Sequence, residues 1–540
     1  MLRSSPGITP DGMKLAAHRF LPRKLGRMYA AVLTGILLAM AYPPFSLPWT
    51  AWVALVPLAV TVLVRPHRSF ATGWVAGFSY WFLTLTWLRH VTIAGWLGLS
   101  AYCAVYFGLF AWLVARLFDA ADLSRWRAVA FVFLGATFWS GLEFLRGVLF
   151  TGFPWNYLGV SQYRNLPLIQ TAALGGVCLV SWIIALVNMA GCTVLLRAKN
   201  RVGPWPDPAA VGVTLLAVVA AWLYGGRVLA DGNLPAETLR VVLVQPNVAQ
   251  HVKWDEEFVD DIYDKLDRLT RRAAASKPDL IVWPETALPD FLRFSRRSYS
   301  LVTSLVAQAG VRLLVGTMDA DWDTKGSPAY YNSSLLIGLD GGIEDRYDKQ
   351  HLVMFGEYVP FGRWLPFLRA LTPLEESFTP GRDGSPILVS RAIPAGILIC
   401  FEDTVPALAL RAVRRGARLL INQTNDAWFD PSAGSWQHLA NAVFRCVENR
   451  VPAIRCTNSG VTCVVDVWGR ICKVLADSRM NPRVEGVLDV EVRVPCRLQA
   501  TPYRHTGDLF GGVTAATTVL ALGAVSVRVR RRGGYLGLRG

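Results

Sequence analysis

The chain has 540 residues, of which 53% are hydrophobic, with 20 tryptophans and a formal net charge of +16. A composition this apolar is typical of membrane proteins, and the length excludes a single compact domain. The positive charge would also suit nucleic-acid binding. However, the basic residues of the apolar part stand mainly at the ends of its runs, as membrane topology determinants do. We therefore expect a membrane protein with no nucleic-acid partner.

Seven apolar segments fill the first part of the chain, and an eighth lies near its end. They cover residues 28–44, 47–64, 70–88, 92–117, 127–145, 168–196, 209–229 and 509–527. Because a helix of about 20 residues crosses ~30 Å of hydrocarbon, we expect an α-helical membrane bundle of eight helices. The first two segments are short and could form a hairpin. Ala39-Met40-Ala41 mimics a signal-peptidase site, but Pro43 and Pro44 follow it, so we expect no cleavage.

Basic residues concentrate in alternate connections between these segments. The second, fourth and sixth connections carry several each, as do both ends of the chain, whereas the first connection carries none. The positive-inside rule then places both termini in the cytoplasm and the long connection outside. The predicted organisation is a basic arm (1–27), a seven-helix region (28–230), an extracytoplasmic domain (231–508), an eighth helix (509–527) and a basic tail (528–540).

Two features lie at the expected outer ends of the fifth and sixth helices. Residues 152–157 read Gly-Phe-Pro-Trp-Asn-Tyr, an aromatic and uncharged stretch that we expect to lie in the membrane interface. Glu143 and Arg146 are three residues apart on one helix. Arg146 is therefore expected either to pair with Glu143 or to face lipid headgroups or substrate.

From Thr238 onward the apolar runs shorten to strand length and alternate with helical stretches. Strands are expected at 239–245, 280–283, 312–316, 334–338, 343–347, 396–400, 419–422, 452–456, 461–467 and 470–475, with helices at 256–275, 297–309 and 405–414. This alternation predicts a layered α/β domain with mixed sheets. Asp403 is the expected N-cap of the helix at 405–414.

Three reactive side chains stand at or just past expected strand ends: Glu285, Lys349 and Cys400. Sites in open α/β sheets gather at the carboxyl ends of strands, so the three are expected to meet. Cys400 would be the nucleophile, with the following helix favouring its thiolate. Glu285 would accept and return the proton, and Lys349 would lower the thiol pKa and stabilise an oxyanion. Each residue alone is better explained by an ordinary core or surface position.

Taken together, the stretches 283–287, 347–353 and 399–402 resemble the glutamate, lysine and cysteine motifs of the nitrilase superfamily. That resemblance implies an αββα sandwich and a Glu–Lys–Cys triad. With the helices before and after, the chain resembles the apolipoprotein N-acyltransferase family. By motif position the resemblance implies supporting roles for Glu357, Glu402 and Trp254. Phe401 lacks the hydroxyl of the tyrosine often found there, which rules out a side-chain hydrogen bond from that position.

The resemblance also implies an activity. An acyl chain would pass from a phospholipid, expected to be phosphatidylethanolamine, through a Cys400 thioester to the amine of a diacylglyceryl-cysteine on an apolipoprotein. The protein would lie in the bacterial cytoplasmic (inner) membrane with its catalytic domain on the periplasmic side, and would need no cofactor. The scattered histidines predict no metal site. The triad equally allows a membrane-tethered amidase or nitrilase acting on a small amide. A membrane scaffold with a catalytically inactive domain is a third alternative, but it conflicts with the presence of all three triad residues.

The stretch 361–371 is unusually apolar and aromatic for a loop between Glu357 and Cys400. Arg363 is expected to hold phosphates while Trp364 and Leu368 enter the acyl region, so the stretch is expected to be a mobile lid that dips into the membrane. Six cysteines fall between Cys400 and Cys496, where a disulfide is possible but has no assigned pairing.

Overall fold

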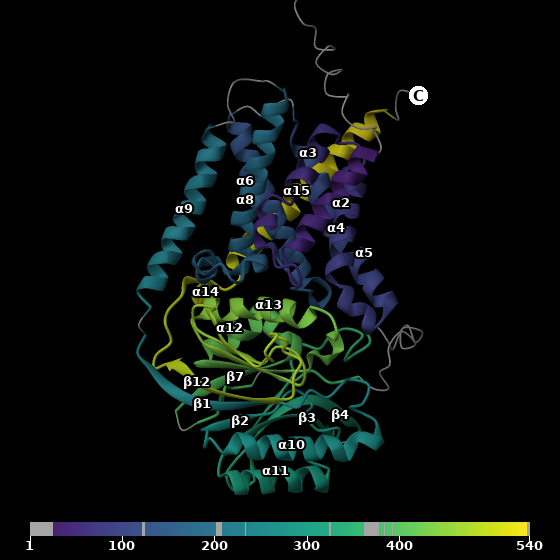
Figure 1. Cartoon of the computed structure of the whole chain (residues 1–540). Helices are drawn as coiled ribbons and strands as arrows, with labels where there is room; N and C mark the ends of the chain where they lie inside the picture. The colour runs from purple at the N-terminus through teal and green to yellow at the C-terminus, as the bar shows by residue number, and fades with distance from the viewer. Residues whose placement is uncertain are drawn as a thin grey trace, which may run out of the picture. The chain divides into compact units, whose positions relative to one another are not determined.

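The computed structural model describes residues 25–120, 125–200, 208–232, 234–322, 326–360, 377–382, 384–390 and 392–536. The chain divides into two compact units (Figure 1). The first comprises Met1–Arg146, Ser181–Ala220 and Val513–Gly540, and the second comprises Gly147–Val180 and Ala221–Gly512. The second unit therefore holds every residue from 221 to 512 together with the connection after the fifth long apolar segment.

All eight apolar segments are helical. They form α2 (Leu25–Met40), α3 (Val56–Val64), α4 (Ser69–Thr84), α5 (Ile93–Leu117), α6 (Arg125–Val148), α8 (Ala172–Asn200), α9 (Pro208–Ala230) and α15 (Leu509–Leu536). Among the described residues, five helices are long and apolar enough to cross a membrane: Ile93–Leu117, Trp126–Thr151, Ala172–Ala198, Pro208–Ala230 and Leu509–Val529. The helices α2, α3 and α4 are shorter, so helix length supports five of the eight expected crossings.

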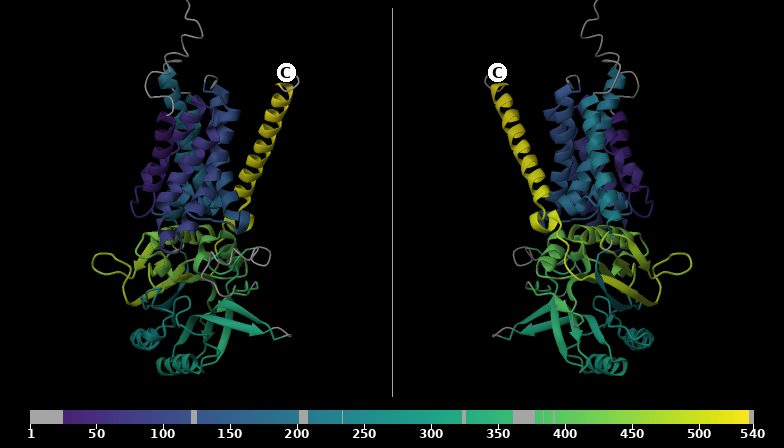
Figure 2. Two further views of the ribbon diagram at one scale, coloured as in Figure 1. Left: turned by 90° about the vertical axis from the view of Figure 1, so that its right-hand side faces the viewer. Right: turned by 90° about the vertical axis from the view of Figure 1, so that its left-hand side faces the viewer.

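Small residues set the spacing of the helices in the first unit, whose bundle is seen from two sides in Figure 2. A Cβ at Gly73 would lie 2.4 Å from the Phe107 carbonyl oxygen, so α4 and α5 approach at backbone distance. Close approach of this kind is typical of membrane helices, which gain stability from packing rather than from the hydrophobic effect. Asn188 on α8 also forms buried hydrogen bonds with the segment before α3. Its Oδ1 accepts from Leu55 N at 2.8 Å, and its Nδ2 donates to Ala51 O at 2.9 Å.

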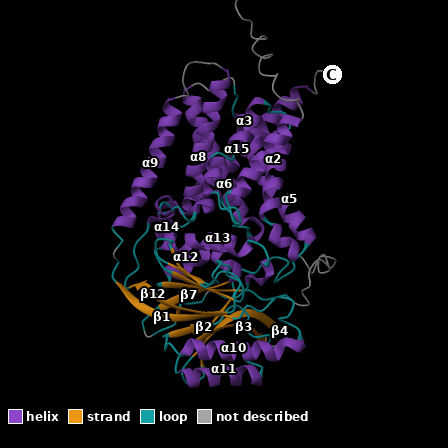
Figure 3. Ribbon diagram, in the orientation of Figure 1, coloured by secondary structure: helices purple, strands orange, loops and turns teal. Residues whose placement is uncertain are grey.

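Two six-stranded sheets form the centre of the second unit (Figure 3). The first has the order β12-β1-β2-β3-β4-β5 and the second the order β11-β10-β9-β8-β7-β6. Strands β1 to β3 are parallel, as are β7 to β9, and the outer strands pair antiparallel. The strands are β1 (Ala236–Gln245), β2 (Leu280–Val282), β3 (Arg312–Trp322), β4 (Pro328–Ile337), β5 (Ile343–Asp348), β6 (Ile387–Leu388), β7 (Pro394–Ile399), β8 (Leu419–Thr424), β9 (Ala453–Thr457), β10 (Cys463–Val465), β11 (Ile471–Val474) and β12 (Gly486–Pro495).

Three apolar cores hold the layers of this unit together. The largest lies between the sheets and takes Val241 and Val282 from one sheet and Ile397 and Ile421 from the other. A second packs the first sheet against α10 (Val259–Ala274) and α11 (Arg296–Ala309), and a third packs β7 and β8 against α12 (Pro406–Arg414). With α13 (Gly434–Asn449) beside α12 on the outer face of the second sheet, the unit is the expected αββα sandwich.

The secondary structure differs from the expectation in a few places. The short β6, the regular β12 and the helix α13 were not expected, and the Asp403 N-cap prediction is wrong. Asp403 lies inside a 3-10 turn, 2% exposed, and forms an ion pair with Arg455. Helix α12 begins instead after Val405, with Pro406 in its first turn. All nine cysteines belong to the described part of the chain, and none forms a disulfide.

Candidate active site

Cys400 lies where β7 ends and the 3-10 turn η7 (Cys400–Thr404) begins. Its φ of +55° is in the left-handed region, so the chain reverses sharply at this residue. Asn422 of the adjacent strand β8 donates through Nδ2 to the Cys400 carbonyl oxygen at 3.0 Å, which fixes the turn. The thiol is half-buried beside the core between the two sheets.

Glu285 follows β2 and is 7% exposed. Its Oε1 accepts from Asn332 Nδ2 at 2.8 Å, and its Oε2 accepts from the backbone N–H of Asn425 at 2.8 Å. Gly316 on β3 makes room for this segment, because a Cβ there would lie 2.3 Å from the Pro284 carbonyl oxygen. The carboxylate is therefore held by groups from β4 and from the end of β8.

Lys349 directly follows β5 and is 1% exposed. Its Nζ donates to Glu357 Oε1 at 2.8 Å and lies 3.6 Å from Glu285 Oε1. Asn332 Nδ2 also reaches Glu357 Oε1, at 3.1 Å, so one amide joins both carboxylates. Burial acts to lower the pKa of Lys349, but Glu357, Cys400 and Glu285 outweigh it and raise that pKa, so the residue stays an ammonium.

The electrostatics at Cys400 differ from the expectation of a pre-formed thiolate. Burial and the charge of Glu285 raise the pKa of the thiol, and they outweigh Lys349 and a hydrogen bond with Thr424, which lower it. Lys349 therefore lowers the pKa of the thiol, as predicted, but this effect is smaller than the combined effect of burial and Glu285. A thiol of this kind needs a base at hand when it attacks, and the neighbouring Glu285 carboxylate can be that base.

Lys253 is a second buried lysine at the site, 2% exposed, whose side chain was not singled out from the sequence. Its Nζ donates to Thr286 Oγ1 at 2.8 Å and to the Glu285 carbonyl oxygen at 3.4 Å. Burial lowers its pKa to about 8, with Glu285 acting in the opposite direction. Lys253 therefore adds a second positive group beside the Glu285 segment, whereas Lys349 contacts both Glu285 and Glu357.

Glu402 is fully buried and accepts four hydrogen bonds. Its Oε2 accepts from Tyr347 Oη at 2.9 Å and from Ile399 N at 2.8 Å, and its Oε1 accepts from Gln350 N at 2.7 Å and His351 N at 2.9 Å. It therefore links the segment that carries Lys349 to the turn that carries Cys400, in keeping with a supporting role.

Comparison with known proteins decides the family. Residues 34–190 match the apolipoprotein N-acyltransferase N-terminal domain, and residues 240–495 match carbon-nitrogen hydrolase. Apolipoprotein N-acyltransferase of Geobacter metallireducens is 36% identical over 91% of this chain and 94% of its own length, and that of Caulobacter vibrioides is 33% identical over 96% and 97%. The chain belongs to the apolipoprotein N-acyltransferase family.

A solved carbon-nitrogen hydrolase from Helicobacter pylori is 17% identical, with a TM-score of 0.35, and the match covers 47% of this chain and 89% of that chain. Membership of the apolipoprotein N-acyltransferase family makes the protein an acyltransferase enzyme of the nitrilase superfamily. With its long apolar helices, it is a membrane protein.

Within this family member, the aromatic loop at 152–157 packs against the second unit's own residues, and its expected place in the membrane interface stays a prediction. Trp155 is fully buried, and its Nε1 donates to Gln437 Oε1 on α13 at 3.0 Å. The Trp155 and Phe401 rings are nearly parallel, 6.1 Å apart, and Phe401 also stacks on His351. Phe401 thus contributes an aromatic face beside the nucleophile in place of a hydroxyl.

Of the remaining predicted residues, Trp254 and Arg146 belong to the described part of the chain. Trp254 is 49% exposed, and its ring centroid lies 5.8 Å from Lys253 Nζ. Arg146 is 3% exposed, with its guanidinium over the Trp81 ring at 4.7 Å, so the prediction that it faces lipid is wrong. The cation is satisfied by an aromatic face inside the protein. Arg363, Trp364 and Leu368 lie outside the described residues, and so does their proposed lid.

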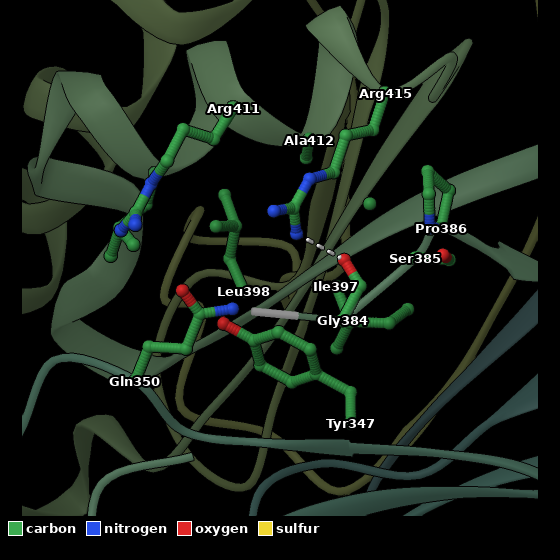
Figure 4. Close-up of a pocket in the computed structure, with 12 residues that line it drawn as sticks. Tyr347, Gln350, Gly384, Ser385, Pro386, Ile397, Leu398, Arg411, Ala412 and Arg415 are labelled. Carbon is green, nitrogen blue, oxygen red and sulfur yellow. Dashed lines mark hydrogen bonds between the residues drawn. The ribbon is translucent and has the colours of Figure 1, made fainter. Parts of the chain in front are cut away.

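A separate pocket lies between β7 and α12 (Figure 4). Tyr347 and Gln350 line one side of it, and Arg415 reaches across to donate to the Gly384 carbonyl oxygen at 2.8 Å. Lys349 lies between these two residues in the sequence, but its Nζ contacts the carboxylates of Glu357 and Glu285 instead. Tyr347 and Gln350 therefore line this pocket, whereas Lys349 contacts the carboxylates of the candidate active site.

Proposed function

We propose that the protein transfers an acyl chain from a phospholipid to the N-terminal amine of a diacylglyceryl-cysteine on apolipoproteins, through a thioester at Cys400. Family membership supports the reaction class. The observation that carries the residue assignment is the placement of Lys349 between Glu357 and Glu285, with both Lys349 and Glu285 acting on the Cys400 thiol. An ammonium and a carboxylate that both act electrostatically on a thiol are the parts that covalent acyl transfer needs.

In the first half-reaction, Glu285 accepts the thiol proton as Cys400 Sγ attacks the sn-1 ester carbonyl carbon. Lys349, held as an ammonium, stabilises the resulting oxyanion. The ester C–O bond then breaks, Glu285 returns the proton to the departing oxygen, and a lysophospholipid leaves. Because burial and Glu285 raise the pKa of the thiol, the attack requires a base, and Glu285 is proposed to be that base.

In the second half-reaction, the α-amine of the diacylglyceryl-cysteine attacks the thioester carbonyl. Glu285 accepts the amine proton, the C–S bond breaks, and the proton passes to the sulfur. The products are an amide on the lipoprotein and the free Cys400 thiol. Glu357 and Asn332 keep Lys349 and Glu285 in place through both steps. Glu402 and Trp254 are the proposed supporting residues around them.

We place the protein in the cytoplasmic (inner) membrane, with residues 231–508 on the periplasmic side and both termini in the cytoplasm. The concentration of basic residues in alternate connections supports this orientation. The donor is proposed to be phosphatidylethanolamine. Hydrolysis of a small amide, the alternative that the triad alone allows, is not favoured by the family to which the chain belongs.

The test combines purified protein, phosphatidylethanolamine and a synthetic diacylated lipopeptide. Mass spectrometry should find one added acyl group on the lipopeptide amine. With phospholipid radiolabelled in its acyl chain and no acceptor, label should appear on the protein and be lost in Cys400→Ala. Label retained by Cys400→Ala, or release of free fatty acid without lipopeptide acylation, would overturn the proposal.

A further inference from the structure

An ion pair is buried on α13, the helix beside α12 on the outer face of the second sheet (Figure 1). Arg445 is 2% exposed and Glu448 is fully buried, and Arg445 Nη2 donates to Glu448 Oε1 at 2.8 Å. The proposed acyl transfer uses neither residue. A buried ion pair is by itself weak evidence for stability, so the groups that the pair contacts indicate its role.

Arg445 contacts the turn that carries the nucleophile. Its Nη1 donates to the Thr404 carbonyl oxygen at 2.9 Å, and Thr404 is the last residue of η7, which begins at Cys400. Within the turn, Thr404 Oγ1 donates to the Phe401 carbonyl oxygen at 2.7 Å. Asn422 on β8 holds the first residue of the turn through the Cys400 carbonyl oxygen. The guanidinium therefore fixes the opposite end of the same turn.

Glu448 contacts the place where the backbone of α8 is interrupted. Gly175 and Gly176 are non-helical, with a φ of +71° at Gly176, and the regular helix resumes after them. Glu448 Oε1 accepts from the Val177 backbone N–H at 3.1 Å. A carboxylate in this position satisfies a free N–H group of a helix start and lies at the positive end of the helix dipole. All of these residues belong to the second unit.

A single carboxylate oxygen joins the two sets of contacts. Glu448 Oε1 accepts both from Arg445 Nη2 and from the Val177 N–H. Hydrogen bonds therefore run without interruption from the start of the regular part of α8, through the ion pair, to the end of the nucleophile turn. Burial raises the pKa of Glu448 to about 7, and Arg445 acts in the opposite direction. The carboxylate is thus mostly charged at pH 8.

We propose that Arg445 is a positioning residue for Cys400, which fixes the far end of the nucleophile turn, and that Glu448 ties this position to the start of the regular part of α8. The inference rests on the proposed function for its effect on acyl transfer, but not for its effect on the turn. Loss of the Arg445 contact lets the turn open and moves the thiol relative to Glu285. Attack on the donor then slows, whereas binding of the donor changes little.

The test replaces both members of the pair, because removing one would leave the other as an unpaired buried charge. Arg445→Met/Glu448→Gln removes the hydrogen bond to the Thr404 carbonyl oxygen, while the amide that replaces the carboxylate can still accept from the Val177 N–H. The variant therefore isolates the contact between α13 and the nucleophile turn.

Arg450→Met is the matched control, because it also removes a buried guanidinium. Arg450 directly follows α13 and is 3% exposed. It donates to Gln170 Oε1 at 2.6 Å and to the Val467 carbonyl oxygen at 3.2 Å, and its guanidinium lies over the Trp468 ring. Within the part of the chain that the structure describes, none of its hydrogen bonds reaches η7. A general loss of stability should therefore affect the control, but a loss of positioning should not.

Two measurements are made on the full-length protein in detergent at pH 8. Hydrogen–deuterium exchange of the peptide that covers residues 399–405 reports on the turn itself. Single-turnover acylation of Cys400 by phosphatidylethanolamine with a labelled acyl chain reports on the chemistry. The concentration of phospholipid that gives half the maximal rate separates binding from positioning.

In the double variant, exchange of this peptide should rise at least about fivefold and the acylation rate should fall at least about tenfold, with the half-saturating phospholipid concentration changed less than twofold. Arg450→Met should stay within about twofold of wild type in all three quantities. Exchange like that of wild type, faster exchange with an unchanged acylation rate, or an equal effect of Arg450→Met would each overturn the proposal. Wild-type protein that forms no acyl-enzyme would refute the proposed function instead, and exchange would still test the turn.

Arg445→Lys decides the question if the double variant does not fold. It keeps a cation beside Glu448 but has one nitrogen in place of the two that contact Glu448 and Thr404. Exchange should again be faster and acylation slower, each by at least about threefold. Exchange and acylation at the wild-type rates would contradict the positioning role.

Discussion

The backbone N–H of Asn425 donates to Glu285 Oε2 at 2.8 Å, although the two residues are 140 positions apart. The contact joins the end of β2 in the first sheet to the end of β8 in the second. The proposed base is therefore oriented by the stacking of two sheets, and not by its own loop. A substitution that shifts one sheet against the other should therefore move the Glu285 carboxylate through this contact.

Asn332 provides the clearest test of the carboxylate pair. Its Nδ2 donates to Glu285 Oε1 and Glu357 Oε1, so Asn332→Ala leaves both without that donor. Hydrogen bonds to charged groups contribute about 1.5–3 kcal/mol, which corresponds to roughly 10- to 100-fold in rate. We expect a loss of that size in single-turnover acylation of Cys400. Asn481→Ala, at an exposed position, is the control and should retain the wild-type rate.

Glu402→Gln should destabilise the second unit as well as lower activity. The amide offers one acceptor oxygen to four donors and turns an NH₂ group toward the others. At about 1–3 kcal/mol for each unsatisfied buried group, we expect a loss of roughly 2–5 kcal/mol. Thermal unfolding should show a clearly lower midpoint, while Glu491→Gln on the exposed side of β12 should not. An unchanged midpoint for Glu402→Gln would argue against this role.

Lys253 should give stability a distinctive pH dependence. Burial lowers its pKa to about 8 in the folded protein from the ordinary 10.5, so the unfolded chain binds more protons between those values. The free energy of unfolding contributed by Lys253 therefore rises with pH from about 8 to 10.5. Urea unfolding in detergent should show the difference between wild type and Lys253→Met changing in that direction. The same substitution at the surface residue Lys473 should leave no such slope.

Trp155 should matter for stability although it lies more than 200 residues from the nucleophile in sequence. Trp155→Ala removes a fully buried indole and its bond to Gln437, which costs about 3–5 kcal/mol. Trp155→Phe keeps an aromatic ring beside Phe401 and loses the hydrogen bond and part of the buried indole, about 1–3 kcal/mol. Unfolding measurements should rank the variants in that order. Trp322→Ala, at a 56% exposed tryptophan, should be close to wild type.

The sequence alone determined the α/β sandwich, the helical segments and the three motif residues at strand ends. Those features are local: apolar runs of a given length form strands or helices, and a reactive residue after such a run is placed by the strand itself. The triad prediction combined the convergence of strand ends with the resemblance of three stretches to the nitrilase motifs.

Tertiary structure decided everything that depends on contact between distant segments. Asn332 is an ordinary polar residue in the sequence, and the missed helix α13 is rich in polar side chains that prove to be buried. The pKa of Cys400 is also shifted in the direction opposite to the expectation, because burial and Glu285 outweigh Lys349. Burial and charge pairing are properties of the assembled layers, so no local pattern along the chain encodes them.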